Sequence, residues 1–412
     1  MAKELAHFKN FAKLKDTSLE FNDITVLAGK PSTGKSYVMK FMYAVNETIA
    51  NISSGKDKLL YTFIGNDKLQ ARLDAILNLN IIKFDDLFRE YINVNNYTEA
   101  WDYLNKNIER IKNESIKDKD YLLLDIFKST LKELSEKEKF SLKQSVEAKY
   151  HFILRNILES IFISIDEINN SFTFESKNKF KVNYSSKGLL VNNIRQNDII
   201  ENTIFVETPL IIEFEKFLPS ERYNTPYHID SLLQELNKSD YSFTSDESSN
   251  FIKSFRNKSM NIIRGNISKK SQGFLFESES GKNYSIVNVS SGIKSIGLLQ
   301  YLVTNKALKK GSILFWEEPE VHLHPEWQLK MVDLFVELMN AGVKIVFSTH
   351  SPYMADYLNA ISQKRGFRDR VSFNVLEEKD GIVSNYILDD NNWHILQKEL
   401  MDTFEDILWQ YL

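Results

Sequence analysis

The 412-residue sequence contains no cysteine, which excludes disulfide bonds, cysteine-ligated zinc and cysteine nucleophiles. Glycine and proline are scarce, at 14 and 7 residues. No apolar run is long enough to span a bilayer, and the first residues lack the apolar core of a signal peptide. The net charge of −4 gives no global basic character that would indicate nucleic-acid binding. These absences lead us to expect a soluble protein of the cytoplasm.

The best-defined motif is Gly29-Lys30-Pro31-Ser32-Thr33-Gly34-Lys35-Ser36, which matches the phosphate-loop pattern G-x-x-x-x-G-K-S. The apolar run 24–27 before it predicts a buried strand, and apolar residues at helical spacing from Tyr37 to Ile49 predict a helix. The first N–H groups of that helix would face a phosphate. Lys35 would reach the outer phosphates, and the Ser36 hydroxyl would bind magnesium. The alternative is a glycine turn that binds nothing.

The segment after this helix changes character several times. Residues 59–64 predict a strand, and residues from about 68 to 170 are helical, charged and free of glycine and proline. Within them, an apolar stripe from Leu142 to Ile161 predicts an amphipathic helix whose stripe is a packing face. We expect a helical arm here that serves as a partner or self-assembly surface. Residues 172–215 predict strands, and residues 219–256 predict loops around two short helices.

Two strand ends in the last third carry chemically useful side chains. The apolar stretch 311–316 ends in Glu317 and Glu318, and the stretch 343–347 ends shortly before His350. Beside a phosphate loop, the first acid can hold magnesium and the second can orient or deprotonate a water molecule. His350 could touch the γ-phosphate. Each feature alone has a plainer interpretation, since strand-end acids are often only solvated and a single histidine is often structural.

In this order, the phosphate loop, Ser290-Ser291-Gly292, Glu-Glu-Pro-Glu and Ser-Thr-His-Ser resemble the ABC-type ATPases of the OLD (overcoming lysogenisation defect) and related AAA-labelled families. The SMC chromosome proteins use the same head. The resemblance covers roughly residues 1–66 and 262–360. It implies an α/β fold, an ABC-type P-loop ATPase head with a mixed sheet, an antiparallel β layer and an inserted helical arm. The expected parts are the N-terminal head (1–78), the helical insertion (79–171), a strand and loop-rich segment (172–261), the C-terminal head (262–370) and a final hairpin and helix (371–412).

The resemblance also implies roles for individual residues. Gly29 to Tyr37 would bind ATP, and Ser36 with Glu317 would hold Mg²⁺. Glu318 resembles the hydrolytic acid, and His350 resembles the switch histidine. Ser290, Ser291 and Gly292 resemble the signature that contacts the γ-phosphate bound to the opposite protomer, which implies a head-to-tail dimer around two ATP molecules. His324 falls where related heads have their dimer-loop aspartate.

Three departures from the pattern concern the rate of hydrolysis. Glu317 stands where many relatives have aspartate. Pro31 and Ser32 stand where Asn-Gly is usual, which removes one N–H donor and a permissive backbone position. The usual Q-loop glutamine has no clear counterpart, and Gln70 is a weak candidate.

We therefore expect a slow ATPase that opens and closes a dimer, as the sensor or regulator of a bacterial anti-phage or toxin-like system. OLD proteins carry a nuclease domain after the ATPase, and the chain after His350 is too short for one, so the effector, a nuclease or toxin, would be a separate protein. The alternatives are an SMC-like repair or chromosome ATPase, a transporter subunit and a non-hydrolysing ATP-bound scaffold. The chain lacks the long coiled coils and the cysteine zinc hook of the SMC-like repair and chromosome ATPases. In a transporter subunit the signature would follow the phosphate loop much sooner. Six basic residues form a modest cluster, which we interpret as a solvent-exposed face: Lys253, Arg256, Lys258, Arg264, Lys269 and Lys270. The alternative is a contact with nucleic acid.

Overall fold

The computed structural model describes residues 3–53, 102, 146–162, 164–176, 181–192, 200–214, 225–237, 246–270, 273–389 and 391–401. The chain divides into two compact units, Met1–Ala50 with Leu154–Leu412, and Asn51–Ile153. Most of the second unit lies outside the described residues. The predicted strand at 59–64, the candidate Gln70 and most of the predicted helical insertion therefore lie outside them too. The first unit contains every other residue predicted to take part in chemistry.

A mixed sheet of eleven strands forms the centre of the first unit, in the order β6-β5-β4-β1-β2-β14-β13-β3-β12-β11-β7. Parallel pairing joins β13, β3, β12, β11 and β7 in this order, and antiparallel pairing joins β6, β5, β4, β1 and β2. Strand β14 connects the two sets, because it pairs antiparallel with β13 and parallel with β2. The strands are β1 Glu4–Phe11, β2 Leu14–Phe21, β3 Ile24–Gly29, β4 Phe172–Ser176, β5 Lys181–Ser185, β6 Gly188–Asn192, β7 Asn202–Val206, β11 Ser312–Glu317, β12 Lys344–Thr349, β13 Val371–Lys379 and β14 Ile382–Ile387.

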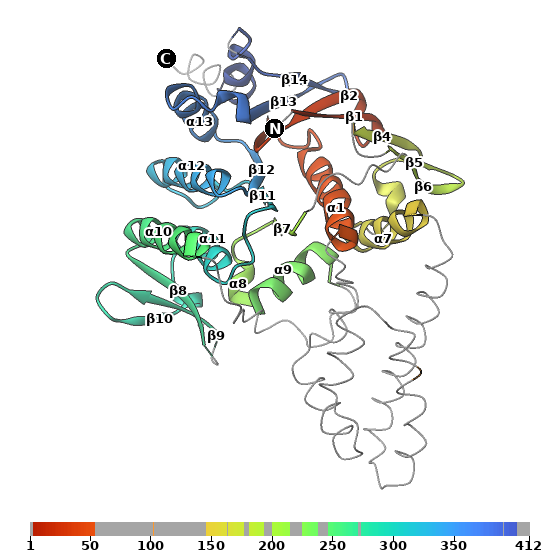
Figure 1. The fold of residues 1–412 in the computed structure, drawn as a ribbon. Coiled ribbons are helices and arrows are strands. Elements are labelled where there is room, and N and C mark those ends of the chain that lie inside the picture. Colours follow the sequence, from red (N-terminus) through yellow and green to blue (C-terminus); the bar gives the residue numbers. More distant parts are fainter. Residues whose placement is uncertain are drawn as a thin grey trace. The chain divides into compact units, whose positions relative to one another are not determined.

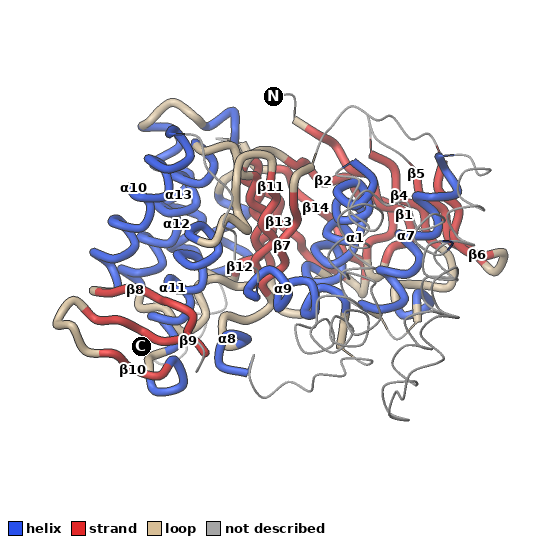
Figure 2. The backbone as a smooth tube through the Cα atoms, turned by 60° about the horizontal axis from the view of Figure 1, so that its bottom comes forward, coloured by secondary structure: helices blue, strands red, loops and turns tan. Residues whose placement is uncertain are grey.

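Helices cover both faces of the parallel strands. Helices α12 and α13 lie on one side of them and α1 lies on the other (Figures 1 and 2). All residues of β3 are buried, as expected for a parallel strand that is covered on both faces. The helices are α1 Lys35–Ser53, α7 Val146–Ile161, α8 Ile211–Phe214, α9 Tyr227–Asn237, α10 Asp246–Ile263, α11 Ser291–Thr304, α12 Pro325–Asn340 and α13 Pro352–Lys364.

A second sheet of three strands has the order β10-β9-β8. Its strands are β8 Gly265–Lys270, β9 Gly273–Ser278 and β10 Asn283–Ser285. It packs against α11, where Gly297 is required because a Cβ there would lie 2.3 Å from the Ile267 side chain. Much of the predicted basic cluster is paired in this region: Lys258 with Glu337, Lys270 with Glu277, and Arg256 with Asn266. This pairing supports the solvated-face interpretation of the cluster.

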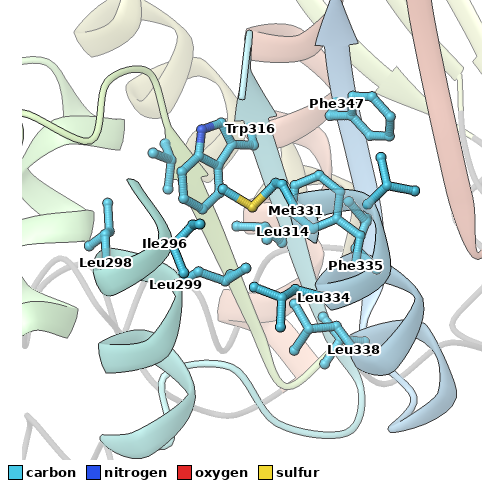
Figure 3. Packing of buried hydrophobic residues seen from close by; sticks show 14 of the residues in the cluster. Ile296, Leu298, Leu299, Leu314, Trp316, Met331, Leu334, Phe335, Leu338 and Phe347 are labelled. Atoms are coloured by element: carbon cyan, nitrogen blue, oxygen red, sulfur yellow. The ribbon is translucent and has the colours of Figure 1, made fainter. Parts of the chain in front are cut away.

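The hydrophobic core fixes the strand ends that carry the predicted acids and histidine. Trp316 of β11 and Phe347 of β12 both pack against Phe335 of α12, with ring centroids 6.2 and 5.4 Å apart (Figure 3). Ile296 and Leu299 of α11 are fully buried in the same cluster. A large apolar residue directly before Glu317 therefore anchors the end of β11, and this anchoring positions the carboxylate that follows.

An aromatic cluster anchors helix α1 in the same way. The Phe41 ring lies 4.9 Å from Phe11 of β1 and 5.1 Å from Phe174 of β4. Such edge-to-face pairs add to the free energy of burying the rings. The helix that follows the phosphate loop is thus held against the antiparallel strands at its first turns, and its N-terminus has a defined position.

Most of the predicted elements are present. The α/β class with a mixed sheet and an antiparallel layer is confirmed, as are the strands between residues 4 and 28, the hairpin at Lys379–Gly381 and the helix from Pro325 to Asn340. Strand β8 was not predicted, whereas β6 lies within residues 172–215, where strands were predicted. The prediction of two short helices within 219–256 was wrong for α10, which has 18 residues. No helix of the described residues is long and apolar enough to cross a membrane.

Candidate nucleotide-binding site

The predicted phosphate loop lies between β3 and α1, which begins at Lys35. Gly29 has φ of 143°, and a Cβ there would lie 2.3 Å from the carbonyl oxygen of Leu376, so only glycine fits. The Lys35 ammonium donates hydrogen bonds to the carbonyl oxygens of Gly29, at 2.7 Å, and Lys30, at 2.8 Å. Thr33 Oγ1 donates to the same Lys30 carbonyl at 2.9 Å. The loop is therefore closed by hydrogen bonds from its own lysine and threonine side chains.

Two neighbouring residues qualify this picture. Ser32 has φ of 64°, in the left-handed region that glycine adopts without strain. Replacement of the usual glycine by Ser32 therefore places backbone strain in the loop. Tyr37, in the first turn of α1, has its ring 5.4 Å from that of Phe162. Its side chain packs there, so any part it takes in nucleotide binding rests on its backbone.

Glu317 lies at the carboxyl end of β11, beside Ser348 of the parallel strand β12. Burial raises the pKa of this carboxyl from 4.5 to about 7, and Glu207 and Glu318 add to the rise, whereas Lys40 and a hydrogen bond with Ser36 oppose it. Its Oε1 is buried and has no hydrogen-bond partner among the described residues. A carboxylate oxygen without a partner beside the Ser36 hydroxyl is the kind of hard oxygen donor set that suits Mg²⁺. These two predicted metal ligands are therefore brought together, and they fit the ion.

Glu318 and His350 also meet. The His350 Nε2 atom lies 3.4 Å from a carboxylate oxygen of Glu318, whose side chain is 44% exposed. Glu318 has φ of 46°, and its N–H donates to the Ser348 carbonyl at 3.1 Å. Backbone strain of this kind persists only where surrounding contacts maintain it, and it is common at functional sites. Burial, and then the charge of Lys35, lower the pKa of His350, whereas Glu318 raises it. The net fall in pKa favours a neutral imidazole.

Glu320 is a site residue that sequence reasoning did not single out. Its Oε1 accepts a hydrogen bond from the His350 backbone N–H at 2.6 Å, which ties the loop after β11 to the end of β12. Burial raises the pKa of Glu320 despite this bond and a further one from Thr349. Glu320 is the last residue of the Glu-Glu-Pro-Glu motif, and the motif by itself indicates no separate role for it. Only the contact, however, shows that it orients the backbone of the predicted switch histidine.

Glu207 is a second residue that the sequence did not assign. It follows Val206, which pairs with Trp316 in the parallel ladder, so Glu207 and Glu317 leave neighbouring strands at the same edge. Lys40 of α1 lies 3.0 Å from its Oε1, and His228 Nε2 lies 2.9 Å from its Oε2. The hydrogen bond from His228, and then that from Lys40, lower the pKa of Glu207 to about 2 against the effect of burial. The signal available in the sequence was an acid directly after an apolar strand, the same signal that identified Glu317.

The predicted signature lies at the start of α11. Ser290 is the N-cap residue, but its side chain makes no capping hydrogen bond. A Cβ at Gly292 would lie 3.2 Å from the His322 carbonyl oxygen. One turn on, the buried Lys294 forms an ion pair with Glu213 of α8. Within the described chain, no hydrogen bond or ion pair joins residues 290–292 to the phosphate loop. His324, in turn, caps α12 by accepting from the Glu326 N–H at 3.3 Å.

A phosphate loop followed by a helix, with carboxylates at the end of a nearby parallel strand, defines a P-loop nucleotide-binding protein. A family model described as AAA ATPase domain matches residues 6–355, and the chain belongs to this family. No curated protein matches the sequence.

Similar solved structures are heads of SMC proteins. The SMC head domain from Thermotoga maritima is 9% identical with a TM-score of 0.42, over 94% of this chain and 100% of that one. A SmcHead bound to the C-winged helix domain of ScpA is 10% identical with a TM-score of 0.44, over 95% and 99%. A Smc head domain from Pyrococcus furiosus, with an extended coiled coil and bound to the C-terminal domain of ScpA, is 11% identical with a TM-score of 0.36, over 98% and 99%.

Proposed function

We propose that this protein binds ATP with Mg²⁺ and hydrolyses it slowly. The observation that carries the proposal is the buried, unpartnered oxygen of Glu317 beside Ser36, at the first turn of the helix that follows the phosphate loop. No three His, Asp or Glu side chains of the described residues cluster as a metal site. Mg²⁺ would therefore be held by Ser36, Glu317 and the nucleotide phosphates together. When bound, it supplies positive charge to the phosphate oxygens.

The side chains of the loop then have defined tasks. Lys35 exchanges its bonds to the Gly29 and Lys30 carbonyls for bonds to the outer phosphates, a charge-assisted contact of the stronger kind. The N–H groups at the start of α1 bind the phosphates along the helix axis. Positioning and electrostatic stabilisation of this kind account for most of the catalysis of phosphoryl transfer.

Glu318 is the proposed base and His350 the proposed switch. The Glu318 carboxylate is partly exposed and can take a proton from an attacking water molecule. His350, held neutral and linked through its backbone to Glu320, can donate or accept one hydrogen bond at the terminal phosphate. Loss of that phosphate would change this bond, and the change would pass to the loop that contains Glu320.

We further propose that two copies associate head-to-tail, each completing the other's site with Ser290, Ser291 and Gly292. Exposed apolar side chains near the residues that would meet support this arrangement. Val321 and Tyr353 are exposed on the segments next to Glu318 and His350. Phe214, Tyr284 and Val287 are exposed near the start of α11. Lys294 of α11 marks this proximity, because it pairs with Glu213, the residue before Phe214, and donates to the Val287 carbonyl at 3.4 Å. Burial of such residues favours association.

In the cell, we propose the role of sensor or regulator in a bacterial anti-phage or toxin-like system, acting with a separate nuclease or toxin as effector. This role rests on the resemblance to OLD-like ATPases alone. A non-hydrolysing ATP-bound scaffold is the second candidate. The strained Ser32 and the missing N–H of Pro31 favour it, because both weaken the loop that must hold the γ-phosphate.

The test is a mixture of two variants, Lys35→Ala and Ser291→Arg. Each homodimer has two defective sites, so each variant alone should be inactive, although Ser291→Arg should still bind ATP. In a mixed dimer one site combines the intact loop of one chain with the intact signature of the other. After random exchange about half of the dimers are mixed, so activity should return to about a quarter of wild type if the sites act independently.

Phosphate release is measured after subunit exchange has been verified. Full activity of Ser291→Arg alone would exclude the shared site. Tight ATP binding without turnover in the wild-type protein would favour the scaffold instead.

A further inference from the structure

The phosphate loop has a neighbour that the proposed function leaves unused, the C-terminal helix of residues 394–401. Leu396 of this helix is fully buried in the main hydrophobic cluster. Just before the helix, the Trp393 ring lies 4.8 Å from that of Phe373, and Trp393 Nε1 donates to Asp356 at 2.8 Å. These contacts hold the helix at a fixed place, so the side chain one turn after Leu396 also has a fixed place.

That side chain is Glu399, and it lies against the first residues of the loop. Its Oε1 accepts a hydrogen bond from the Lys30 backbone N–H at 3.4 Å, and its Oε2 lies 4.0 Å from the Lys30 ammonium. The Glu399 side chain is only 8% exposed, whereas that of Lys30 is 52% exposed. A charge this deeply buried is screened much less by salt than a surface charge.

The Glu399 charge also reaches Lys35, the residue that would bind the outer phosphates. Burial lowers the pKa of Lys35 to about 8, and Glu399 is one of the carboxylates that oppose this fall. The others are Glu318, Glu320 and Glu317, all in the segment that follows β11. Glu399 comes from another part of the chain and has no task in magnesium binding or water activation. Glu399 therefore places a fixed negative charge beside the loop that would bind the phosphates.

We propose that Glu399 is a specificity-determining residue that lowers the affinity of the site for highly charged phosphate chains, and so weakens ATP binding relative to ADP. The inference rests on the proposed function of the loop as a nucleotide site. Like charges repel in proportion to their product, so the effect grows with each phosphate of the ligand. Glu399 also attracts Lys30 and Lys35, the two cations that a polyphosphate would otherwise draw to itself. Both effects act in the same direction. Glu399 also favours the protonated form of Lys35, which acts in the opposite direction. The titrations are therefore made at pH 6.5, below the Lys35 pKa of about 8, where Lys35 stays protonated.

The test is Glu399→Gln in the full-length protein. Glutamine keeps the size of the side chain and an oxygen that can accept from the Lys30 N–H, so only the charge is lost. Calorimetric titrations at low salt use MgATP, MgADP and adenosine as probes. ATP affinity should rise about three- to tenfold and ADP affinity by a smaller factor, while adenosine affinity stays unchanged. The gain should shrink in high salt.

Glu175→Gln is the matched control, because Glu175 pairs with Lys181 on β4 and β5, away from the loop, at 3.3 Å. It should leave all three affinities unchanged. Glu399→Ala, which removes the charge in a smaller side chain, is measured in parallel and should give the same order of gains. Should Glu399→Gln fail to fold, this variant carries the test.

Three results would overturn the inference: unchanged affinities, an equal gain for all three probes, or weaker ATP binding, which would mean that Glu399 only supports the loop. Loss of ATP binding in Lys35→Ala without any effect at Glu399 would leave the proposed function standing and remove this inference. A wild-type protein that binds no nucleotide would overturn both.

Discussion

Substitution of Glu317 by glutamine should stabilise the metal-free protein, although it removes a proposed magnesium ligand. Burial raises the pKa of Glu317 from 4.5 to about 7 in the folded state. Between these two pH values the folded state binds more protons than the unfolded state, so stability falls as pH rises. The destabilisation is absent well below pH 4.5, grows between pH 4.5 and about pH 7, and is complete above pH 7.

The magnitude follows from the size of the shift. One pKa unit corresponds to about 1.4 kcal/mol, so the ionised Glu317 lowers the free energy of unfolding by about 3 kcal/mol above pH 7. Glutamine carries no charge at any pH and avoids this cost. Glu317→Gln should therefore exceed wild type by about 3 kcal/mol at pH 8 and by only about 1 kcal/mol at pH 5.

The assay is urea unfolding with EDTA present, followed by tryptophan fluorescence, because the buried Trp316 precedes Glu317 directly. Glu175→Gln, which removes an exposed charge, should show neither the gain nor its pH dependence. A Glu317→Gln protein that is equally stable to wild type at both pH values would refute the argument that this carboxylate is desolvated. Excess MgATP should reverse the order, since only wild type has the full ligand set.

Four further substitutions test the site, two in the phosphate loop and two in the segment that follows β11. Lys35→Ala should abolish ATP binding in a titration, and unchanged affinity would remove the phosphate-loop assignment. Glu318→Gln should keep ATP binding and slow hydrolysis by about a hundredfold to ten-thousandfold, as loss of a positioned base does; near-normal phosphate release would mean that another group is the base. Glu320→Ala leaves the His350 N–H without its acceptor, so it should lower the free energy of unfolding by about 1–3 kcal/mol and reduce turnover, with ATP affinity retained; an unchanged urea midpoint would contradict this. Ser32→Gly should relieve left-handed strain of about 1 kcal/mol and so raise the melting temperature by about one degree, and a lower melting temperature would show that the loop is not strained there.

Local pattern was sufficient for the parts of the site that are contiguous in the chain. The loop from Gly29 to Ser36 needs only a strand before it and a helix after it, and both are signalled by nearby apolar residues. Likewise, Glu317 and Glu318 were recognisable because they end an apolar run, and Pro325 marks the start of α12. Strand β8, which was not predicted, carries a weaker signal because it lies at the edge of its sheet and carries polar residues on one side.

The sequence by itself thus determined the phosphate loop, the acid pair, the position of the histidine and the α/β class, because each depends on short-range pattern. The tertiary structure alone decided which distant residues surround that loop. Glu207 reaches the site because β7 pairs with β11, Glu320 because its carboxylate meets the His350 backbone, and Glu399 because the C-terminal helix packs beside Lys30. Contacts such as that of Lys30 with Glu399 depend on strand order and helix packing, which many sequences of the same local pattern could satisfy differently.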